Sequence, residues 1–165
     1  MSFFLYNKNS ILIEWPKIIS ENILEDILKF SNKLLKLNTI HSTINGYNSL
    51  LIQYKLNIRS FYVNHGKIKS SAYVIDRLAY ISDTNGIFFK DFSKLRGLKY
   101  LIIDCLKFNA NPSHFNLEQA VKISRKVDAK KTILTNLHSD LDYTLLKSSL
   151  PKNIIPAYDG MVLNL

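Results

Sequence analysis

Between residues 49 and 105 the chain carries a series of short apolar runs bounded by polar residues, and this pattern constrains the fold more than any other feature. The runs are rich in β-branched and aromatic residues, and Asn, Gly and Asp separate them, which is typical of strands joined by turns. In order they are SLLIQYK, IRSFYVN, SAYVID, LAYIS and KYLIIDC. The sequence therefore predicts a sheet across this region.

The period of the apolar residues lengthens after this series. Asn116 and Gln119 form a capping box in front of apolar residues at helical spacing, which predicts an amphipathic helix near residues 116–127. TILTN is expected to be a buried strand, and a short helix follows Asp142 and ends before Pro151. Strands followed by alternating helices and strands indicate an α/β or α+β layer.

The two ends of the chain differ from this central region in the secondary structure that their sequences predict. IIPAYDGMVLN predicts a terminal hairpin around Asp159 and Gly160. Near the start, SILIEWPKII is typical of a strand, and SENILEDILKFSNKLLK has the spacing of a helix. We therefore expect residues 1–44 to be a separate strand-plus-helix segment and residues 45–165 to be the main domain.

Composition indicates a globular, cytoplasmic domain. The chain has 165 residues, 47% of them hydrophobic and 21% charged, which is enough for one buried core. The apolar runs are too short to cross a membrane, and the N-terminus lacks the pattern of a signal peptide. Cys105 is the single cysteine, which suits a reducing compartment. These features predict no membrane partner.

The net charge of +9 comes almost entirely from lysines that are scattered singly among Ile and Asn residues. There is no arginine cluster and no basic stripe in the sequence. The codon bias of an AT-rich genome produces the same enrichment in Lys, Ile and Asn. We therefore interpret the charge as compositional and expect no nucleic-acid partner.

Histidines and aspartates follow several of the expected strands. His65, Asp83, Asp104 and His138 are each placed at or just after the end of an apolar run. Histidine and carboxylate are the ligand types that a hydrolytic metal centre needs. Spacing alone leaves ordinary surface histidines and turn aspartates as alternatives, and we expect Asp104 to be a hydrogen-bond acceptor behind the ligands.

Three segments carry a resemblance to a known family. NHGKIKSSAYVIDRLAYISDTNG, IIDCLKFNANPSHFNLEQAV and ILTNLHSDLDY, the last continued by LPKNIIPAYDGMVLNL, resemble the C-terminal half of the metallo-β-lactamase-fold hydrolases. The most similar subgroup is that of the phosphoribosyl cyclic phosphate phosphodiesterases, with the tRNA 3′-processing ribonucleases as relatives. The resemblance implies one αβ layer of an αββα sandwich, with the N-terminal half missing or replaced.

The same resemblance implies roles for individual residues. His65 would bind one divalent metal ion, zinc or manganese, Asp83 would bridge two ions, and His138 would bind the second. His114 would be the catalytic residue that faces the substrate phosphate or the leaving group. The implied activity is that of a metal-dependent phosphodiesterase acting on a small phosphate ester.

Two departures from the family pattern put that activity in question. Many relatives carry the last histidine at the position of Asn136, two residues before His138. The motif His-x-His-x-Asp-His, which supplies most of the metal ligands, is absent, and His41 is the only histidine before His65. The alternatives are an active hydrolase completed by a homo-oligomer or a separate N-terminal half, a non-catalytic remnant, and an RNA-processing accessory protein.

Overall fold

The computed structural model describes residues 2–7, 10–14 and 57–164, and these residues form two sheets and three helical segments. The larger sheet has six strands in the order β3-β4-β5-β6-β7-β8. Its strands are β3 (Ile58–His65), β4 (Ile68–Ile75), β5 (Leu78–Ile81), β6 (Tyr100–Asp104), β7 (Lys131–Thr135) and β8 (Ile154–Pro156). The smaller sheet has the order β1-β2-β9 and consists of β1 (Ser2–Asn7), β2 (Ser10–Glu14) and β9 (Met161–Asn164).

The helical segments are the 3₁₀ helix η1 (Phe89–Leu95) and the α-helices α3 (Leu117–Val127) and α4 (Tyr143–Ser149). The expected capping box is present, since the Asn116 side chain accepts from Gln119 N while the Gln119 side chain accepts from Asn116 N. Asp142 caps α4 by accepting from Leu145 N at 2.8 Å. The two predicted helices that fall within the described residues are confirmed, whereas η1 was not predicted.

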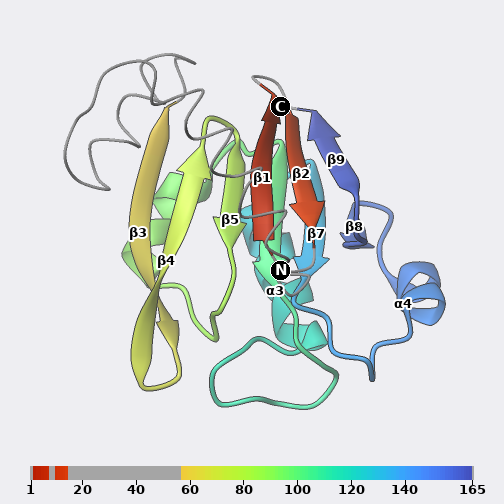
Figure 1. The fold of residues 1–165 in the computed structure, drawn as a ribbon. Helices are drawn as coiled ribbons and strands as arrows, with labels where there is room; N and C mark the ends of the chain where they lie inside the picture. The colour runs from red at the N-terminus through yellow and green to blue at the C-terminus, as the bar shows by residue number, and fades with distance from the viewer. Residues whose placement is uncertain (1, 8–9, 15–56, 165) are drawn as a thin grey trace, which may run out of the picture.

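Strand direction brings the ends of several strands to one edge of the larger sheet. β3 pairs antiparallel with β4 and β4 antiparallel with β5, so β3 and β5 run the same way. β5, β6, β7 and β8 are mutually parallel neighbours. The carboxyl ends of β3, β5, β6 and β7 therefore share an edge, which lies at the bottom of Figure 1 with the loop that follows β6. Such edges of α/β sheets commonly carry functional sites.

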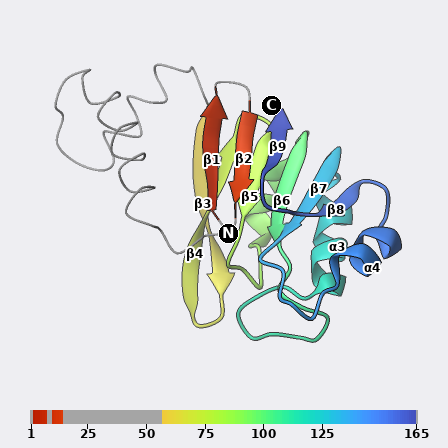
Figure 2. The same cartoon turned by 45° about the vertical axis from the view of Figure 1, so that its right-hand side comes forward.

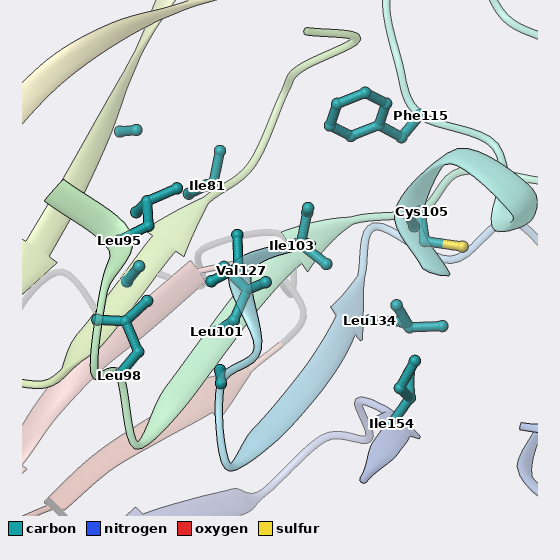
Figure 3. Close-up of a cluster of buried hydrophobic side chains, with 14 of the residues drawn as sticks. Ile81, Leu95, Leu98, Leu101, Ile103, Cys105, Phe115, Val127, Leu134 and Ile154 are labelled. Atoms are coloured by element: carbon teal, nitrogen blue, oxygen red, sulfur yellow. The ribbon is translucent and has the colours of Figure 1, made fainter. Parts of the chain in front are cut away.

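Apolar side chains cover both faces of the six-stranded sheet. One face packs against η1 and α3 in a cluster that includes the fully buried Leu101, Ile103 and Leu134 (Figure 3). The opposite face packs Ile102 and Ile133 against residues of the smaller sheet such as Leu163. Figures 1 and 2 show β1, β2 and β9 on the side of the larger sheet away from α3. The fold is therefore layered as helix, sheet and sheet, and the predicted α/β class is confirmed.

The predicted terminal hairpin is wrong. β8 joins the larger sheet beside β7, while β9 joins the smaller sheet and pairs with β2 from Ser10 to Ile13. β8 pairs with the longer strand β7 and β9 with the longer strand β2, and Gly160 (φ +86°) lies in the turn between the two sheets. The predicted strand over residues 49–55 and helix over 20–36 lie outside the described residues, and the boundary at residue 45 stays a prediction.

No helix in the described ranges has the length and apolar character needed to cross a membrane.

Candidate active site

The candidate site lies where four strands of the larger sheet end. His65 ends β3, Asp83 follows β5, Asp104 ends β6, and Asn136 directly follows β7. Asp83 (φ 50°) and Asn136 (φ 62°) both adopt the left-handed backbone conformation. Asp and Asn tolerate this conformation better than most residues, so they can turn the chain sharply out of a strand. The strand ends therefore present polar groups side by side.

Asp104 is the buried centre of the site. Its side chain is fully buried, and its carboxylate accepts from Thr84 N at 2.9 Å, His114 Nδ1 at 2.7 Å and Asn136 Nδ2 at 3.0 Å. Burial raises the pKa of Asp104, while the hydrogen bonds from Thr84 and Asn136 and the His114 ring oppose this rise. Three donors around one carboxylate favour its ionised form, since a protonated acid would lose an acceptor.

His114 is held in one orientation by Asp104. Nδ1 of the ring donates to Asp104 Oδ2, which leaves Nε2 as the atom that can accept or carry a second proton. The side chain is 18% exposed, so the ring is mostly enclosed but still reaches solvent. Its backbone N donates to Asn111 Oδ1 at 3.1 Å within the loop after β6. A buried carboxylate behind a partly exposed imidazole is an arrangement that suits proton transfer.

Thr84 ties this pair to the neighbouring strand ends. Its backbone N donates to Asp104, and its carbonyl accepts from Phe115 N at 2.8 Å. Its hydroxyl donates to the carbonyl of Asn64 at 2.9 Å and accepts from Gly86 N at 3.1 Å. The end of β3, the loop after β5 and the loop that carries His114 are thereby held as one unit.

His65 lies beside His114. The two ring centroids are 4.7 Å apart, and the rings are nearly perpendicular at 76°. Nδ1 of His65 is 2.8 Å from the carbonyl oxygen of Ser113, to which it donates. This hydrogen bond leaves Nε2 as the free lone-pair atom, which is the usual state of a histidine that binds a metal ion.

Asp83 and His138 occupy more open positions than the pair of histidines. Asp83 is exposed, and its backbone carbonyl accepts from Ser70 Oγ at 2.7 Å. The His138 side chain is 51% exposed, with Nδ1 3.2 Å from Asp140 Oδ1. Asn136, rather than His138, is the residue after β7 that contacts Asp104 and His114.

The donor set does not fit a complete metal centre. Within the part of the chain that the structure describes, no three or more His, Cys, Asp or Glu side chains are grouped so that they could hold a metal ion. A catalytic zinc ion normally has three protein ligands. The metal-ligand roles of His65, Asp83 and His138 therefore stay predictions, and the described residues do not form such a centre by themselves.

Two contacts of the site were not predicted from the sequence. Asn136 was treated only as the position of a missing histidine, yet its amide supports Asp104. The carbonyl of Ser113 was not considered as the partner of His65. The position of Asn136 directly after a buried strand was the sequence signal that could have indicated its contact with Asp104. No side-chain pattern in the sequence indicates the contact between the Ser113 carbonyl and His65.

Comparisons with known proteins agree with the arrangement of the strands. No protein-family model matches the chain, and no curated protein matches it. Among solved structures, a diphosphatase from the PhnP family is 31% identical over 67% of this chain and 44% of that chain, with a TM-score of 0.65. The short form of human tRNase Z is 17% identical over 66% of this chain and 42% of that chain, with a TM-score of 0.54.

A third structure, the metallo-β-lactamase-fold protein YhfI from Bacillus subtilis, is 18% identical over 66% of this chain and 49% of that chain, with a TM-score of 0.53. The chain thus spans less than half the length of each of these three structures. The similarity to tRNase Z and to YhfI, at 17% and 18% identity, supports the fold alone. The 31% identity to the diphosphatase adds a similarity in sequence. About two thirds of the chain therefore has the fold of part of the metallo-β-lactamase-fold proteins.

Proposed function

We propose that this chain carries the phosphate-contacting and proton-transferring part of a phosphoester hydrolase. The observation that carries the proposal is the Asp104–His114 pair, in which a fully buried carboxylate holds a partly exposed imidazole at 2.7 Å. The 31% identity to a structure described as a diphosphatase supports a phosphate ester or anhydride as the substrate class.

The chemistry assigned to the pair follows from its hydrogen bonds. With Nδ1 committed to Asp104, His114 can use Nε2 to donate to a phosphate oxygen or to give a proton to the leaving oxygen. The Asp104 carboxylate stabilises the positively charged ring that precedes this transfer. Because Asp104 is fully buried and His114 is mostly enclosed, the electrostatic interaction between them is stronger than it would be at the surface.

We further propose that His65, Asp83 and His138 contribute to binding a divalent ion, zinc or manganese, only when other residues complete the ligand set. The free Nε2 of His65 supports its part in this role. The required ligands would come from a second copy, from a separate chain, or from residues outside the described ranges. On its own, the chain should bind metal weakly and hydrolyse phosphodiesters slowly or not at all.

Contact with phosphate is tested by NMR of the histidine ring signals. Addition of bis-p-nitrophenyl phosphate should shift the signals of His114 in the unmodified chain, and His114→Ala should weaken the binding measured from backbone signals. Lys152→Ala, an exposed residue outside the site, is the matched control and should bind as the unmodified chain does. Equal binding by the His114→Ala variant would refute the proposed role of this residue.

A non-catalytic remnant is the second candidate function, and the absence of a three-ligand group from the described residues favours it. Metal analysis of the purified chain, combined with hydrolysis of the same diester in zinc or manganese, separates the two candidates. A remnant contains less than one equivalent of metal and shows no turnover above the metal-containing buffer. Stoichiometric metal together with turnover that is lost in His65→Ala would establish an enzyme that completes its site in another way.

A further inference from the structure

A groove of about 450 Å³ lies at the outer edge of the larger sheet, between the β3–β4 hairpin and η1. Aromatic and lysine side chains line it, and we name it the aromatic–lysine groove. Its lining consists of Phe61, Tyr62, Phe88, Lys69, Lys90 and Lys94, together with Asp91. Asp91 is buried and pairs with Lys94 at 2.7 Å, so the groove keeps a net positive charge.

Two lysines of the groove lie close to aromatic rings of its lining. Lys69 Nζ lies 5.8 Å from the centre of the Phe88 ring, and Lys94 Nζ lies 5.1 Å from the centre of the Phe61 ring. Tyr62 is 63% exposed, although a tyrosine on a strand usually packs against a neighbour. Flat aromatic faces next to lysines are the features with which proteins bind single-stranded nucleic acids, since bases stack on the rings and phosphates meet the ammonium groups.

Lysine–ring contacts of the same kind occur at residues next to the groove lining. Phe89 is 87% exposed, and Lys126 Nζ lies 5.6 Å from its ring and 3.7 Å from the ring of Phe92. Phe89 directly follows Phe88 of the groove, so exposed aromatic surface extends past the groove lining, and Tyr62 and Lys69 are themselves exposed. These two properties favour an extended strand over an isolated mononucleotide.

The groove and the candidate active site both include residues of β3 and of the segment after β5. Tyr62 and His65 are on the same strand, about 10 Å apart along β3 at roughly 3.4 Å per residue. Lys69 pairs with Asn64, which also forms a bridge with Gly86, two residues before Phe88. A strand that occupied the groove could therefore place a phosphate near His114.

We propose that the aromatic–lysine groove binds single-stranded nucleic acid beside the site. This proposal goes beyond the proposed hydrolase activity, which does not require it. It also differs from the expectation drawn from the sequence, in which the lysines were scattered and predicted no such partner. The folded chain brings three of them together with the exposed Tyr62 and the partly exposed Phe88, whereas the third ring of the lining, Phe61, is buried in the core.

The test measures binding of a fluorescein-labelled single-stranded uridine oligonucleotide to the full chain by fluorescence anisotropy. EDTA is included so that no metal-dependent step contributes and a failed hydrolase proposal does not affect the result. Tyr62→Ala should weaken binding about tenfold through the loss of one stacked base, and Tyr62→Phe should retain it. Tyr158→Ala replaces another exposed tyrosine (53% exposed) outside the groove and should bind as the unmodified chain does.

Salt dependence and competition test the lysines. Because Lys94 is paired with Asp91, Lys69 and Lys90 are the lysines expected to neutralise phosphates. Log Kd should therefore rise with log salt concentration with a slope of about 1.4, since each phosphate on a single strand contributes about 0.7. The double variant Lys69→Gln and Lys90→Gln should lower that slope by more than 1, whereas Lys130→Gln with Lys152→Gln should leave it unchanged.

Four outcomes would overturn the proposal. Two concern direct binding: no binding at low salt, and binding by Tyr62→Ala equal to that of the unmodified chain. Two concern competition: displacement of the oligonucleotide by inorganic polyphosphate at an equal phosphate concentration, and displacement by uridine monophosphate at an equal nucleotide concentration. Polyphosphate carries the charge without a base, so its success would indicate attraction of any polyanion. Success of the mononucleotide would indicate a small-molecule site.

Discussion

Replacement of Asp104 should separate the loss of its charge from the loss of its hydrogen bonds. In Asp104→Ala, the buried backbone N of Thr84 loses its acceptor, and an unsatisfied buried donor costs about 1–3 kcal/mol. His114 and Asn136 each lose one further hydrogen bond, but both are partly exposed and can turn to water. We expect the free energy of unfolding to fall by roughly 2–4 kcal/mol.

Asp104→Asn should be much less destabilising. The amide oxygen can keep the bonds from Thr84 and His114, and Asn136 can flip its own amide so that its oxygen faces the new NH₂ group. The variant also removes a carboxylate whose pKa is raised mainly by burial, and therefore a charge that burial disfavours. We expect a loss of less than about 1.5 kcal/mol, the value of one ordinary hydrogen bond.

Urea unfolding of both variants and the unmodified chain measures these differences, and the pH dependence adds a second readout. Because the folded-state pKa of Asp104 is raised above 3.8, the folded chain holds this proton more tightly than the unfolded chain. The contribution of Asp104 to stability therefore falls as the pH rises above 3.8, and Asp104→Asn should lack this fall. Equal destabilisation by Asn and Ala would refute the assignment of Asp104 as a triple acceptor.

Three further predictions test other parts of the structure. Burial raises the pKa of Cys105 to about 12, so the native protein should resist alkylation at pH 9, whereas the urea-unfolded protein should react. Fast alkylation without urea would contradict this. The free energy of unfolding should also fall between pH 9.0 and 12, because the Cys105 thiol loses its proton at a lower pH in the unfolded chain than in the folded chain. Gly66→Ala should lower the midpoint of thermal unfolding, because Gly66 has φ +61° and an added Cβ would lie 3.2 Å from Ser113 Cβ. It should also shift the NMR signals of the His65 ring, and unchanged signals would count against this contact. Asn116→Ala should cost about 1 kcal/mol in urea unfolding by removing the α3 cap, and a loss matched by the exposed control Lys122→Ala would argue against the cap.

The sequence by itself determined the elements whose signals are local. The alternation of buried and exposed residues in β3 and the capping box of α3 involve residues only a few positions apart, and both were predicted with nearly the observed bounds. Polar residues at the strand ends also identified His65, Asp83, Asp104 and His138 as candidates, since a residue type and its place after a strand can be recognised without knowledge of its neighbours. His114 was a candidate only through the family resemblance.

The tertiary structure decided which of these residues meet. Asp104 contacts Asn136, 32 residues away, because β6 and β7 are parallel neighbours whose ends coincide. It contacts His114, 10 residues away, because the loop after β6 folds back and Phe115 N donates to Thr84 O. The same pairing left His138 exposed and placed β8 and β9 in different sheets. It also gathered lysines that are separate in the sequence beside Tyr62 and Phe88. Contacts of this kind depend on long-range strand order, which local spacing does not encode.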